Sequence, residues 1–429
     1  MKTLILAGGK GTRIGKTTRK IPKPMIKIGG LSVLEHQINL LKRYGIKEII
    51  ILTGHLAEVI EKYFKNGKDF GVNITYFKEK KPLGTTGGLK EIENKLMEDF
   101  IVVYGDIMLD MDIARLLVFH KSKNSVCTTV LHPNDHPHDS DLVEIDNNQK
   151  IIAFHPKPHD ENKYFRNLVN AGLYVMSPKI LKYIKKGVKA DFGKDIFPKI
   201  IKKEALYGYN TAEYLKDIGT PDRLAKVRKD YRSGKIRQFN RENKRRAIFL
   251  DRDGAINYDP GDLSDVNDFK LLPNVAKAIK LINSSEYLTI VITNQPMIAK
   301  GFMSFKDLDQ IHKKMETLLG LKGAKLDGVY FCPHHPEKGF DGEMPELKIE
   351  CRCRKPKTGM IFEAVKEYNI DLANSWIIGN SERDVETGIN AKIKTILIKK
   401  NQQRFEKCLF NTKKADDLYS AVKSIIKNS

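Results

Sequence analysis

The sequence has no long hydrophobic run and little cysteine. None of its apolar runs approaches the ~20 residues that a membrane-spanning helix needs, so we expect no membrane partner. The start, MKTLILAGGKG, lacks a small-residue cleavage site, which predicts a first strand and not a signal peptide. The chain has five cysteines, an odd number with three of them near a histidine, which disfavours a disulfide framework. These features indicate a reducing compartment and a cytoplasmic protein.

Acidic residues are also in short supply. The chain has 53 acidic residues against 75 lysines and arginines, which gives a formal net charge of +22 at pH 7. The basic residues are scattered rather than striped, and no pattern of stacking aromatics accompanies them. We therefore expect a solvated, lysine-rich surface and anionic substrates, and no nucleic-acid partner. Nucleic-acid binding is the alternative, and it requires an affinity for DNA or RNA that survives competition by a nucleoside triphosphate.

The chain is long enough for two or three domains, each with its own core. Apolar strand patterns alternate with helical patterns over residues 1–228, a polar stretch over 229–245 predicts a linker, and the alternation resumes over 246–429. This alternation predicts an α/β protein with two Rossmann-like three-layer domains, the first on a mostly parallel sheet covered by helices. The oligomeric state stays open, with a homo-oligomer as one alternative.

The sharpest motif is AIFLDRDGAIN, residues 247–257. Four apolar residues run directly into an Asp-x-Asp-Gly sequence, which predicts a strand buried on both faces. Asp251 and Asp253 would then lie at the carboxyl end of the strand, where open α/β sheets place their chemistry. Two acids two residues apart can take different catalytic roles, because one can attack phosphorus and bind a metal while the other transfers a proton.

A glycine-rich turn, LAGGKGTR, follows the first predicted strand at residues 6–13. Its backbone N–H groups could face a phosphate. Two well-known phosphate loops fail to match: Lys10 stands where a nucleoside-triphosphatase loop needs glycine, and Ile14 stands where a dinucleotide fingerprint needs glycine or alanine. A glycine-rich turn alone is also compatible with an ordinary tight turn.

Five further motifs follow in order: IPKPM at 21–25, PLGTTGG at 82–88, VYGD at 103–106, VNAG at 169–172 and YLKDIGTP at 214–221. Together with the first turn they resemble the sugar-1-phosphate nucleotidylyltransferase family over residues 1–228, and most of all its heptose-1-phosphate guanylyltransferase branch. The resemblance implies transfer of a nucleotidyl group from a nucleoside triphosphate to a sugar 1-phosphate, with release of pyrophosphate. In-line attack at the α-phosphorus is catalysed mainly by positioning and by cations.

The resemblance also implies residue roles. The triphosphate would be held by Gly8, Gly9, Gly11 and Thr12, and Arg13 and Lys23 would neutralise the charge that develops on it. Asp106 and Asp217 would bind Mg²⁺. Gly87 and Gly88 would line the base and sugar pocket, Asn170 would bind sugar hydroxyls, and Lys157 would bind the sugar phosphate. One departure is Pro156, which precedes Lys157 where the family often has glutamate. Asp195 could be a sugar ligand or a helix-capping acid.

The second part carries partners for its Asp-x-Asp motif. VITNQ at 291–295, CRKP at 353–356 and WIIGNSERD at 376–384 complete a set that resembles the haloacid dehalogenase phosphatase superfamily, most of all its heptose-bisphosphate and histidinol-phosphate phosphatase branch. The resemblance implies that Asp251 is the nucleophile and that Asp253 is the acid and base. Thr293, Asn294 and Lys355 would contact the phosphoryl group, and Arg354 would contact a second phosphate or the sugar. The Mg²⁺ site would be formed by Asp251, Asp253, Asn380 and Asp384. Asn380 departs from the usual aspartate, which should weaken the metal.

A separate cluster of metal-ligand residues lies between these motifs. Cys332, His334, Cys351 and Cys353 suit a closed tetrahedral zinc site of structural type. The alternative is a set of buried cysteines without metal. We expect Cys127 and Cys408 to be packing residues.

Joined on one chain, the two resemblances predict a bifunctional enzyme. The phosphatase would convert D-glycero-D-manno-heptose 1,7-bisphosphate to heptose 1-phosphate, and the transferase would use that product with GTP to form GDP-heptose. One alternative is a transferase for another sugar 1-phosphate with a differently specific phosphatase. Another is a non-catalytic, regulatory second part, because of Asn380. From the residues alone the base cannot be chosen.

Overall fold

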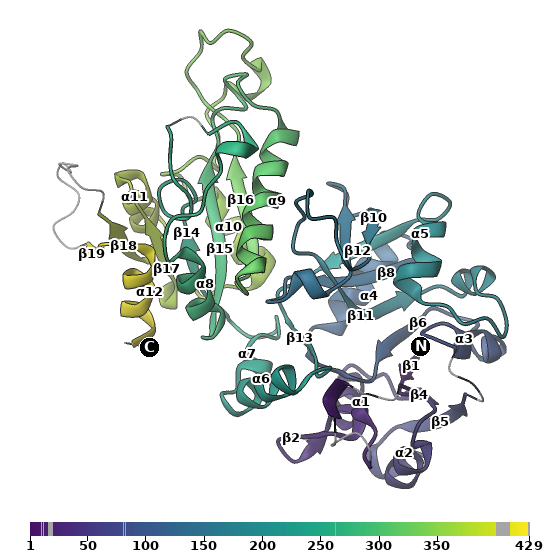
Figure 1. Cartoon of the computed structure of the whole chain (residues 1–429). Coiled ribbons are helices and arrows are strands. Elements are labelled where there is room, and N and C mark those ends of the chain that lie inside the picture. Colours follow the sequence, from purple (N-terminus) through teal and green to yellow (C-terminus); the bar gives the residue numbers. More distant parts are fainter. Residues whose placement is uncertain are drawn as a thin grey trace. The chain divides into compact units, whose positions relative to one another are not determined.

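The computed structural model describes residues 1–9, 11, 13–15, 20–79, 81, 83–261, 263–399 and 412–427 (Figure 1). The chain forms two compact units. Unit 1 comprises Met1–His132, Ser140–Lys157 and Leu168–Asn240, and unit 2 comprises Pro133–Asp139, Pro158–Asn167 and Arg241–Ser429. Each unit is described by itself below. In the described part of the chain, no helix is both long and apolar enough to span a membrane.

Unit 1 is built on a mixed sheet with the path β10-β9-β11-β6-β1-β4-β5, to which β8 and β12 are added beside β11. Its strands are β1 (Lys2–Leu6), β4 (Glu48–Thr53), β5 (Asn73–Lys78), β6 (Phe100–Tyr104), β8 (Cys127–His132), β9 (Leu142–Ile145), β10 (Ile151–His155), β11 (Val169–Met176) and β12 (Leu206–Asn210). The predicted parallel arrangement holds for β6, β1, β4 and β5. In contrast, β11 runs antiparallel to β6 and β8.

The helices of unit 1 are amphipathic and cover the sheet. They are α1 (Val33–Arg43), α2 (Ala57–Phe64), α3 (Gly87–Glu91), α4 (Ile113–Ser122), α5 (Phe197–Ile200), α6 (Pro221–Arg232) and α7 (Lys235–Gln238). The predicted linker, residues 229–245, contains the end of α6 and all of α7. A small second sheet pairs β7 (Ile107–Asp110) with β13 (Tyr214–Asp217). Cys127 is fully buried in the core, and Cys408 lies outside the described residues.

Unit 2 has a fully parallel six-stranded sheet in the order β16-β15-β14-β17-β18-β19. The strands are β14 (Arg246–Leu250), β15 (Tyr287–Asn294), β16 (Gly328–Cys332), β17 (Trp376–Gly379), β18 (Lys394–Ile398) and β19 (Lys413–Ala415). The α/β fold predicted for both halves is thereby confirmed. Because parallel strands are covered on both faces, β14 and β15 read as continuous apolar runs.

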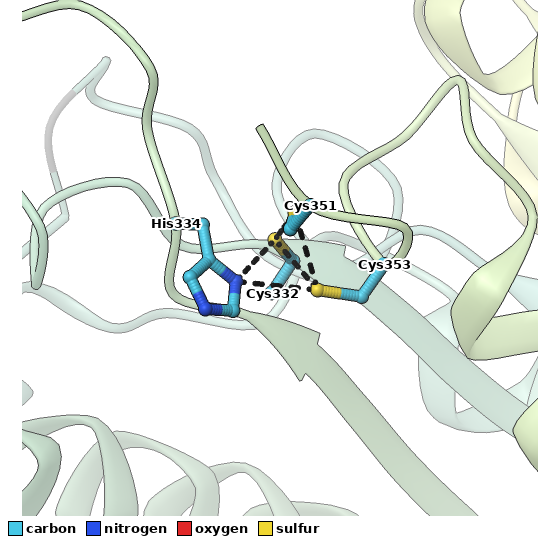
Figure 2. A group of neighbouring side chains, drawn as sticks. All are labelled: Cys332, His334, Cys351 and Cys353. Atoms are coloured by element: carbon cyan, nitrogen blue, oxygen red, sulfur yellow. Dashed lines mark hydrogen bonds between the residues drawn. The ribbon is translucent and has the colours of Figure 1, made fainter. Parts of the chain in front are cut away.

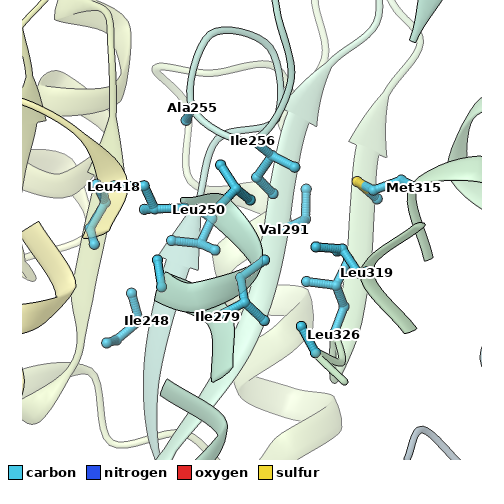
Figure 3. Close-up of a cluster of buried hydrophobic side chains, with 14 of the residues drawn as sticks. Ile248, Leu250, Ala255, Ile256, Ile279, Val291, Met315, Leu319, Leu326 and Leu418 are labelled. Atoms are coloured by element: carbon cyan, nitrogen blue, oxygen red, sulfur yellow. The ribbon is translucent and has the colours of Figure 1, made fainter. Parts of the chain in front are cut away.

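One face of this sheet packs on three helices, α8 (Val275–Asn283), α9 (Phe305–Leu321) and α12 (Leu418–Lys427). Figure 3 shows Ile248 and Leu250 of β14 pointing into the same cluster as Ile279, Leu319 and Leu418. Residues 248 and 250 share that face because side chains alternate along a strand. The helices α10 (Gly359–Tyr368) and α11 (Glu382–Asn390) contact β16, β17 and β18. The polar residues that end β14, β15 and β17 therefore meet at one edge of a rigid sheet.

Candidate functional sites

Unit 1 has a cavity of about 370 Å³ at the carboxyl ends of its parallel strands. It is lined by Gly8, Gly9, Gly11, Arg13, Lys23, Glu79, Gly84, Thr85, Tyr104, Asp106 and Gly219, among others. Thr12, which was predicted to bind the triphosphate, lies outside the described residues. The strand ends supply one polar or glycine-rich segment each, which is the usual location of a ligand in an open α/β sheet. The cavity thus brings together described residues from four separate parts of the sequence: Gly8, Gly9, Gly11 and Arg13; Lys23; Glu79, Gly84 and Thr85; and Asp106.

Lys23 and Asp106 form a partly buried ion pair in this cavity. Lys23 opens a short 3₁₀ turn, η2 (Lys23–Met25), which holds its stem against the protein. Asp106 lies in the turn between β6 and β7, and the Gln37 side chain on α1 donates to the carbonyl oxygens of Tyr104 (3.0 Å) and Ile107 (2.7 Å) on either side. One buried amide therefore fixes both ends of the turn that carries Asp106.

Asp217 ends β13, two residues before Gly219 of the cavity lining. In the β7–β13 pair Asp217 lies opposite Ile107, and the Ile218 N–H donates to the Asp106 carbonyl oxygen at 3.0 Å. Arg223 on α6 donates to both carboxylate oxygens of Asp217, at 3.0 and 3.1 Å. A Cβ built on Gly219 would lie 2.5 Å from Asp217 Oδ1 and 3.4 Å from Lys23 Nζ, so these two side chains approach each other over that glycine. Lys23 also pairs with Asp106, and carboxylates such as these two are ligands that a hard cation such as Mg²⁺ prefers.

The second glycine-rich loop is placed differently from the prediction. Gly84 and Thr85 line the cavity, while Gly87 and Gly88 are buried at the start of α3. A Cβ on Gly88 would lie 2.3 Å from Leu52 Cδ2 and 3.2 Å from Glu79 Oε1, so close packing requires glycine there. Burial raises the pKa of Glu79, and a hydrogen bond from the Gly88 backbone opposes that rise. The sequence motifs gave no signal for Glu79, because it follows β5 without a recognisable pattern.

A polar cluster adjoins this cavity through Thr85. The Thr85 hydroxyl donates to Asp191 at 3.1 Å. A Cβ built on Gly193 would lie 3.5 to 3.6 Å from Asp191 Oδ1, Asn170 Nδ2 and Asp141 Oδ2, so three polar groups surround one point. Asp191 and Asp141 were missed in the sequence because each is a lone acid in a loop.

The remaining predicted sugar contacts lie around the same cluster. The Lys157 backbone N–H donates to Asp141 Oδ1 at 3.2 Å, and the Asn170 backbone N–H donates to the Asp141 carbonyl oxygen at 3.0 Å. Asp195 lies in a π-helical turn (Phe192–Ile196), and its carboxylate accepts a hydrogen bond from the Asp191 N–H at 2.8 Å. Of the two roles considered for Asp195, this contact is the helix-capping one. Irregular helical turns of this kind are frequent at functional sites.

In unit 2 the predicted phosphatase residues form one contiguous site. The Lys355 ammonium donates to Asp251 Oδ1 at 2.7 Å and to Asp384 Oδ1 at 2.6 Å. Asn294, at the end of β15, accepts the Lys355 N–H at 2.9 Å and donates to the Lys355 carbonyl oxygen at 3.1 Å. Thr293 is buried beside it and accepts a hydrogen bond from Gln295 at 2.9 Å. The four motif segments are therefore joined by side-chain contacts.

Burial and the nearby charge of Asp384 raise the pKa of Asp251 to about 7, although Lys355 acts in the opposite direction. Burial lowers the pKa of Lys355, but the two carboxylates outweigh it and the ammonium form is retained. A carboxylate held beside a permanent cation, and short of water, is suited to nucleophilic attack on a phosphoryl group. Perturbed carboxylates of this kind cluster at catalytic sites.

Asn380 faces two other oxygen atoms. Its side-chain amide lies 3.1 Å from the Asp253 carbonyl oxygen and 3.2 Å from Asp251 Oδ2, and its NH₂ group can donate to both. Turned by 180°, the same amide would present its oxygen beside these two acceptors. The three oxygen atoms would then suit Mg²⁺, which prefers oxygen ligands.

Asp384 lies in the network behind this metal site. It accepts hydrogen bonds from the Asn380 and Ser381 N–H groups and from the Ser381 hydroxyl, in addition to Lys355. These bonds place it at the start of α11, within its capping box.

The cysteine cluster is assembled as predicted, as Figure 2 shows. One ligand atom from each of Cys332, His334, Cys351 and Cys353 lies within 4.8 Å of every other. The sulfur–sulfur distances are 3.2 to 3.5 Å, and hydrogen bonding with Cys332, Cys351 and His334 lowers the pKa of the Cys353 thiol to about 5. Four such donors can hold zinc in a closed tetrahedron.

The cluster also fixes the start of the next motif. The Arg354 N–H donates to Cys351 Sγ at 3.3 Å, and the Arg354 guanidinium donates to the His334 carbonyl oxygen at 3.2 Å. Lys355, which was predicted to contact the phosphoryl group, follows directly.

Fold and sites define an α/β protein with two separate centres for phosphate chemistry. The nucleotidyl transferase family profile matches residues 2–234, more than half of the chain. The HAD-hydrolase-like profile matches residues 352–424, and a polynucleotide kinase 3 phosphatase profile matches residues 255–384. The chain belongs to the nucleotidyl transferase family and carries, fused behind that domain, a phosphatase domain of the haloacid dehalogenase type. The two resemblances found in the sequence are confirmed.

Relatives were found for both halves. The chain is 36% identical over 244 residues to a UTP–glucose-1-phosphate uridylyltransferase from Synechocystis sp., covering 53% of this chain and 63% of that one. It is 33% identical over 222 residues to a mannose-1-phosphate guanylyltransferase from Mycobacterium tuberculosis, covering 51% of this chain and 61% of the relative. It therefore spans less than two thirds of these relatives, and their names differ in base and in sugar.

The second half is 40% identical over 150 residues to a D-glycero-beta-D-manno-heptose-1,7-bisphosphate 7-phosphatase from Haemophilus influenzae, covering 35% of this chain and 78% of that protein. Two solved structures also match. HddC from Yersinia pseudotuberculosis complexed with GMP-PN is 26% identical, with 54% of this chain and 99% of that chain covered and a TM-score of 0.47. A D,D-heptose 1.7-bisphosphate phosphatase from B. bronchiseptica, complexed with magnesium and phosphate, is 26% identical, with 43% and 99% covered and a TM-score of 0.37.

Proposed function

We propose that this chain carries out two consecutive steps of nucleotide-sugar synthesis. The domain at residues 246–429 removes the 7-phosphate of D-glycero-D-manno-heptose 1,7-bisphosphate. The domain at residues 1–228 transfers GMP from GTP to the resulting heptose 1-phosphate and releases pyrophosphate. The observation that carries the proposal is the complete phosphatase site in unit 2, around Lys355 and Asp251, on the same chain as the transferase cavity. The product of one site is then a substrate of the other.

In the phosphatase step Asp251 attacks phosphorus and forms an aspartyl phosphate, while Asp253 gives a proton to the leaving sugar oxygen. Water then attacks the same phosphorus, its proton passes to Asp253, and inorganic phosphate leaves Asp251 unmodified. Thr293 and Asn294 contact the phosphoryl oxygens, and Lys355 balances their charge. Mg²⁺ held by Asp251, the Asp253 carbonyl and Asn380 would supply further positive charge. Cys332, His334, Cys351 and Cys353 would hold zinc, which would be structural and would hold the segment that bears Arg354.

In the transferase step the sugar phosphate attacks the α-phosphorus of the nucleotide in line with the leaving pyrophosphate. Backbone N–H groups of the turn at residues 8–13 bind the triphosphate, and Arg13 and Lys23 stabilise the charge that develops on it. Asp106 and Asp217 would hold Mg²⁺, which neutralises phosphate charge. Lys23 and Arg223 pair with these two acids, so they keep the carboxylates in position and limit their mutual repulsion.

Glu79 supports guanine as the base. Its carboxylate lines the transferase cavity and is partly buried, and its two oxygen atoms lie against Gly8 and Gly88. Guanine presents two adjacent donors, N1–H and the 2-amino group, which match a carboxylate. Uracil and thymine present one donor between two carbonyl oxygens, which a carboxylate repels. A buried acceptor pair that a ligand fails to satisfy costs affinity, so Glu79 should select guanine.

The polar cluster beside Thr85 supports a polyhydroxylated sugar. Asp141, Asp191 and Asn170 offer acceptors and a donor around one point next to the nucleotide cavity. Vicinal hydroxyl groups bind well to such sets, because each carboxylate can accept from two hydroxyls. The extra carbon of a heptose brings one more hydroxyl group than a hexose.

The test is a coupled assay with the purified full-length chain, Mg²⁺, heptose 1,7-bisphosphate and each of four nucleoside triphosphates. Phosphate and pyrophosphate are followed separately. The proposal predicts both products with GTP. Phosphate without pyrophosphate would refute the transferase assignment for this sugar or base. If no phosphate is released, but pyrophosphate forms when heptose 1-phosphate is added, the result would favour a regulatory second domain. This alternative is specific because Asn380 stands where the family usually has aspartate.

The base assignment is tested by Glu79→Gln. Glutamine offers one donor and one acceptor, so we expect the preference for GTP over UTP, measured as a ratio of kcat/KM, to fall ~10- to 100-fold. Glu58→Gln, on the exposed side of α2, removes a carboxylate of the same size and should leave the ratio unchanged. An unchanged ratio in the Glu79 variant would contradict this role.

A further inference from the structure

Asp253 is held by a fully buried arginine. Arg252 has 0% of its surface exposed, and its guanidinium donates through Nε to Asp253 Oδ1 and through Nη2 to Asp253 Oδ2, both at 3.0 Å. Two parallel bonds from one planar group fix the plane of the carboxylate as well as its position. Asn257 and Gln295 add one donor each, at 2.9 and 2.8 Å. The acid and base of the phosphatase step is thus oriented by its immediate chain neighbour.

Arg252 is itself fixed from the opposite side. Its Nη1 lies 3.2 Å from His312 Nε2 on α9, and its Nη2 donates to Gln295 Oε1 at 3.0 Å. Burial and the charges of Arg166 and Arg252 lower the pKa of His312 well below its ordinary range, so the ring is neutral and Nε2 accepts from Arg252. In the described residues, Asp253 is the carboxylate that pairs with Arg252. A buried guanidinium held by four hydrogen bonds has little freedom to move.

We infer that Arg252 is the positioning residue for proton transfer by Asp253. It acts through the orientation of its two parallel hydrogen bonds to the carboxylate (the guanidinium fork) and not through charge alone. The inference rests on the proposed phosphatase activity. A carboxylate has about four lone-pair directions, and Asp253 uses them on Arg252, Asn257 and Gln295. The neutral amides can release Asp253 at lower cost than the guanidinium fork. Arg252 then maintains the orientation of the Asp253 carboxylate while one of its oxygen atoms accepts or donates a proton.

Arg252→Lys tests this role because lysine keeps the positive charge and loses the fork. With heptose 1,7-bisphosphate and Mg²⁺, we expect kcat to fall ~30- to 100-fold, with the KM and the Mg²⁺ concentration for half activation within about threefold of wild type. Arg246→Lys, on the partly exposed start of β14, is the matched control and should leave all three unchanged. Wild-type phosphate release is measured first, so failure of the proposed function is seen separately from failure of this inference.

A second measurement separates proton transfer from general damage. An aryl phosphate such as p-nitrophenyl phosphate has a leaving group that needs no proton, so formation of the aspartyl phosphate should not depend on Asp253. Rapid mixing should show a burst of p-nitrophenolate in Arg252→Lys at close to the wild-type rate, followed by slow turnover. An equal loss of the burst and of heptose bisphosphate turnover, or a raised Mg²⁺ requirement, would overturn the inference.

The support behind Arg252 offers a second pair of variants in case Arg252→Lys does not fold. His312→Gln retains an acceptor for Nη1, whereas His312→Leu removes it and leaves that N–H unpaired. We expect His312→Leu to lower kcat ~3- to 10-fold more than His312→Gln, again without a change in the burst. Equal kcat values in the two variants would overturn the inference. Zinc content and pyrophosphate release by the same chain confirm that each variant is folded.

Discussion

Both sites neutralise a carboxylate with a lysine, but they bury that pair to different extents. In unit 1 the side chains of Lys23 and Asp106 are 10% and 30% exposed. In unit 2 those of Lys355 and Asp384 are 4% and 0% exposed. Under the proposed function, the cavity of unit 1 admits a whole nucleotide, whereas the site of unit 2 takes one phosphoryl group. Charge interactions strengthen as water is excluded, so the loss of a single charge should cost more in unit 2.

The largest expected effect is at Asp251. Asp251→Asn removes the nucleophile, and we expect phosphate release from heptose bisphosphate to fall by on the order of 10³-fold or more. Pyrophosphate release from GTP and supplied heptose 1-phosphate should stay within about twofold. Asp268→Asn, an exposed acid in the same unit, is the control. Loss of both activities would show that the two centres are not independent.

A matching change in the more open site is Asp217→Asn. We expect pyrophosphate release to fall ~100-fold, because a neutral amide binds Mg²⁺ less well and gives Arg223 no counter-charge. Phosphate release should be unaffected. Asp222→Asn, exposed in the first turn of α6, should change neither. A loss larger than that of Asp251→Asn would reverse the comparison between the sites.

The pH dependence of Mg²⁺ binding should also distinguish the two sites. The pKa of Asp251 is raised to about 7, so the metal-free carboxyl is mostly protonated at pH 6 and mostly ionised at pH 8. A proton competes with the metal for this group, so Mg²⁺ should bind unit 2 roughly tenfold more weakly at pH 6 than at pH 8. Calorimetric titration of the Asp217→Asn chain measures this site. A constant affinity over that range would contradict the raised pKa.

The smallest expected effect is at Asn380. Asn380→Asp adds a negative charge to the group of oxygen atoms formed by Asp251 and the Asp253 carbonyl. We expect Mg²⁺ to bind ~3- to 10-fold more tightly, with little change in phosphate release at saturating metal. Half-activation by Mg²⁺ in wild type and variant is the measurement. Asn374→Asp, on an exposed turn of the same unit, should leave it unchanged.

The sequence predicted the motif residues better than their surroundings. Asp251 was found because it follows an apolar strand, and Lys355 and the cysteine cluster were found because they lie in short motifs of recognisable residue types. Arg223 lies six residues from its partner Asp217, but it stands outside the motif at 214–221. Gln37 and Glu79 were missed because they contact residues far away in the chain: Gln37, for example, bonds to residues 67 and 70 positions later. The antiparallel half of the first sheet was missed for the same reason, since strand pairing depends on long-range contacts.

The sequence by itself determined the α/β class and the two families, and it predicted the residues proposed to carry the chemistry, because each of these depends on local order along the chain. Only the tertiary structure decided which groups meet. It placed the Asn380 amide beside Asp251, it placed Glu79 against Gly88, and it set His312 behind Arg252, 60 residues away. Orientation and burial arise from packing between distant segments, and no local pattern encodes them.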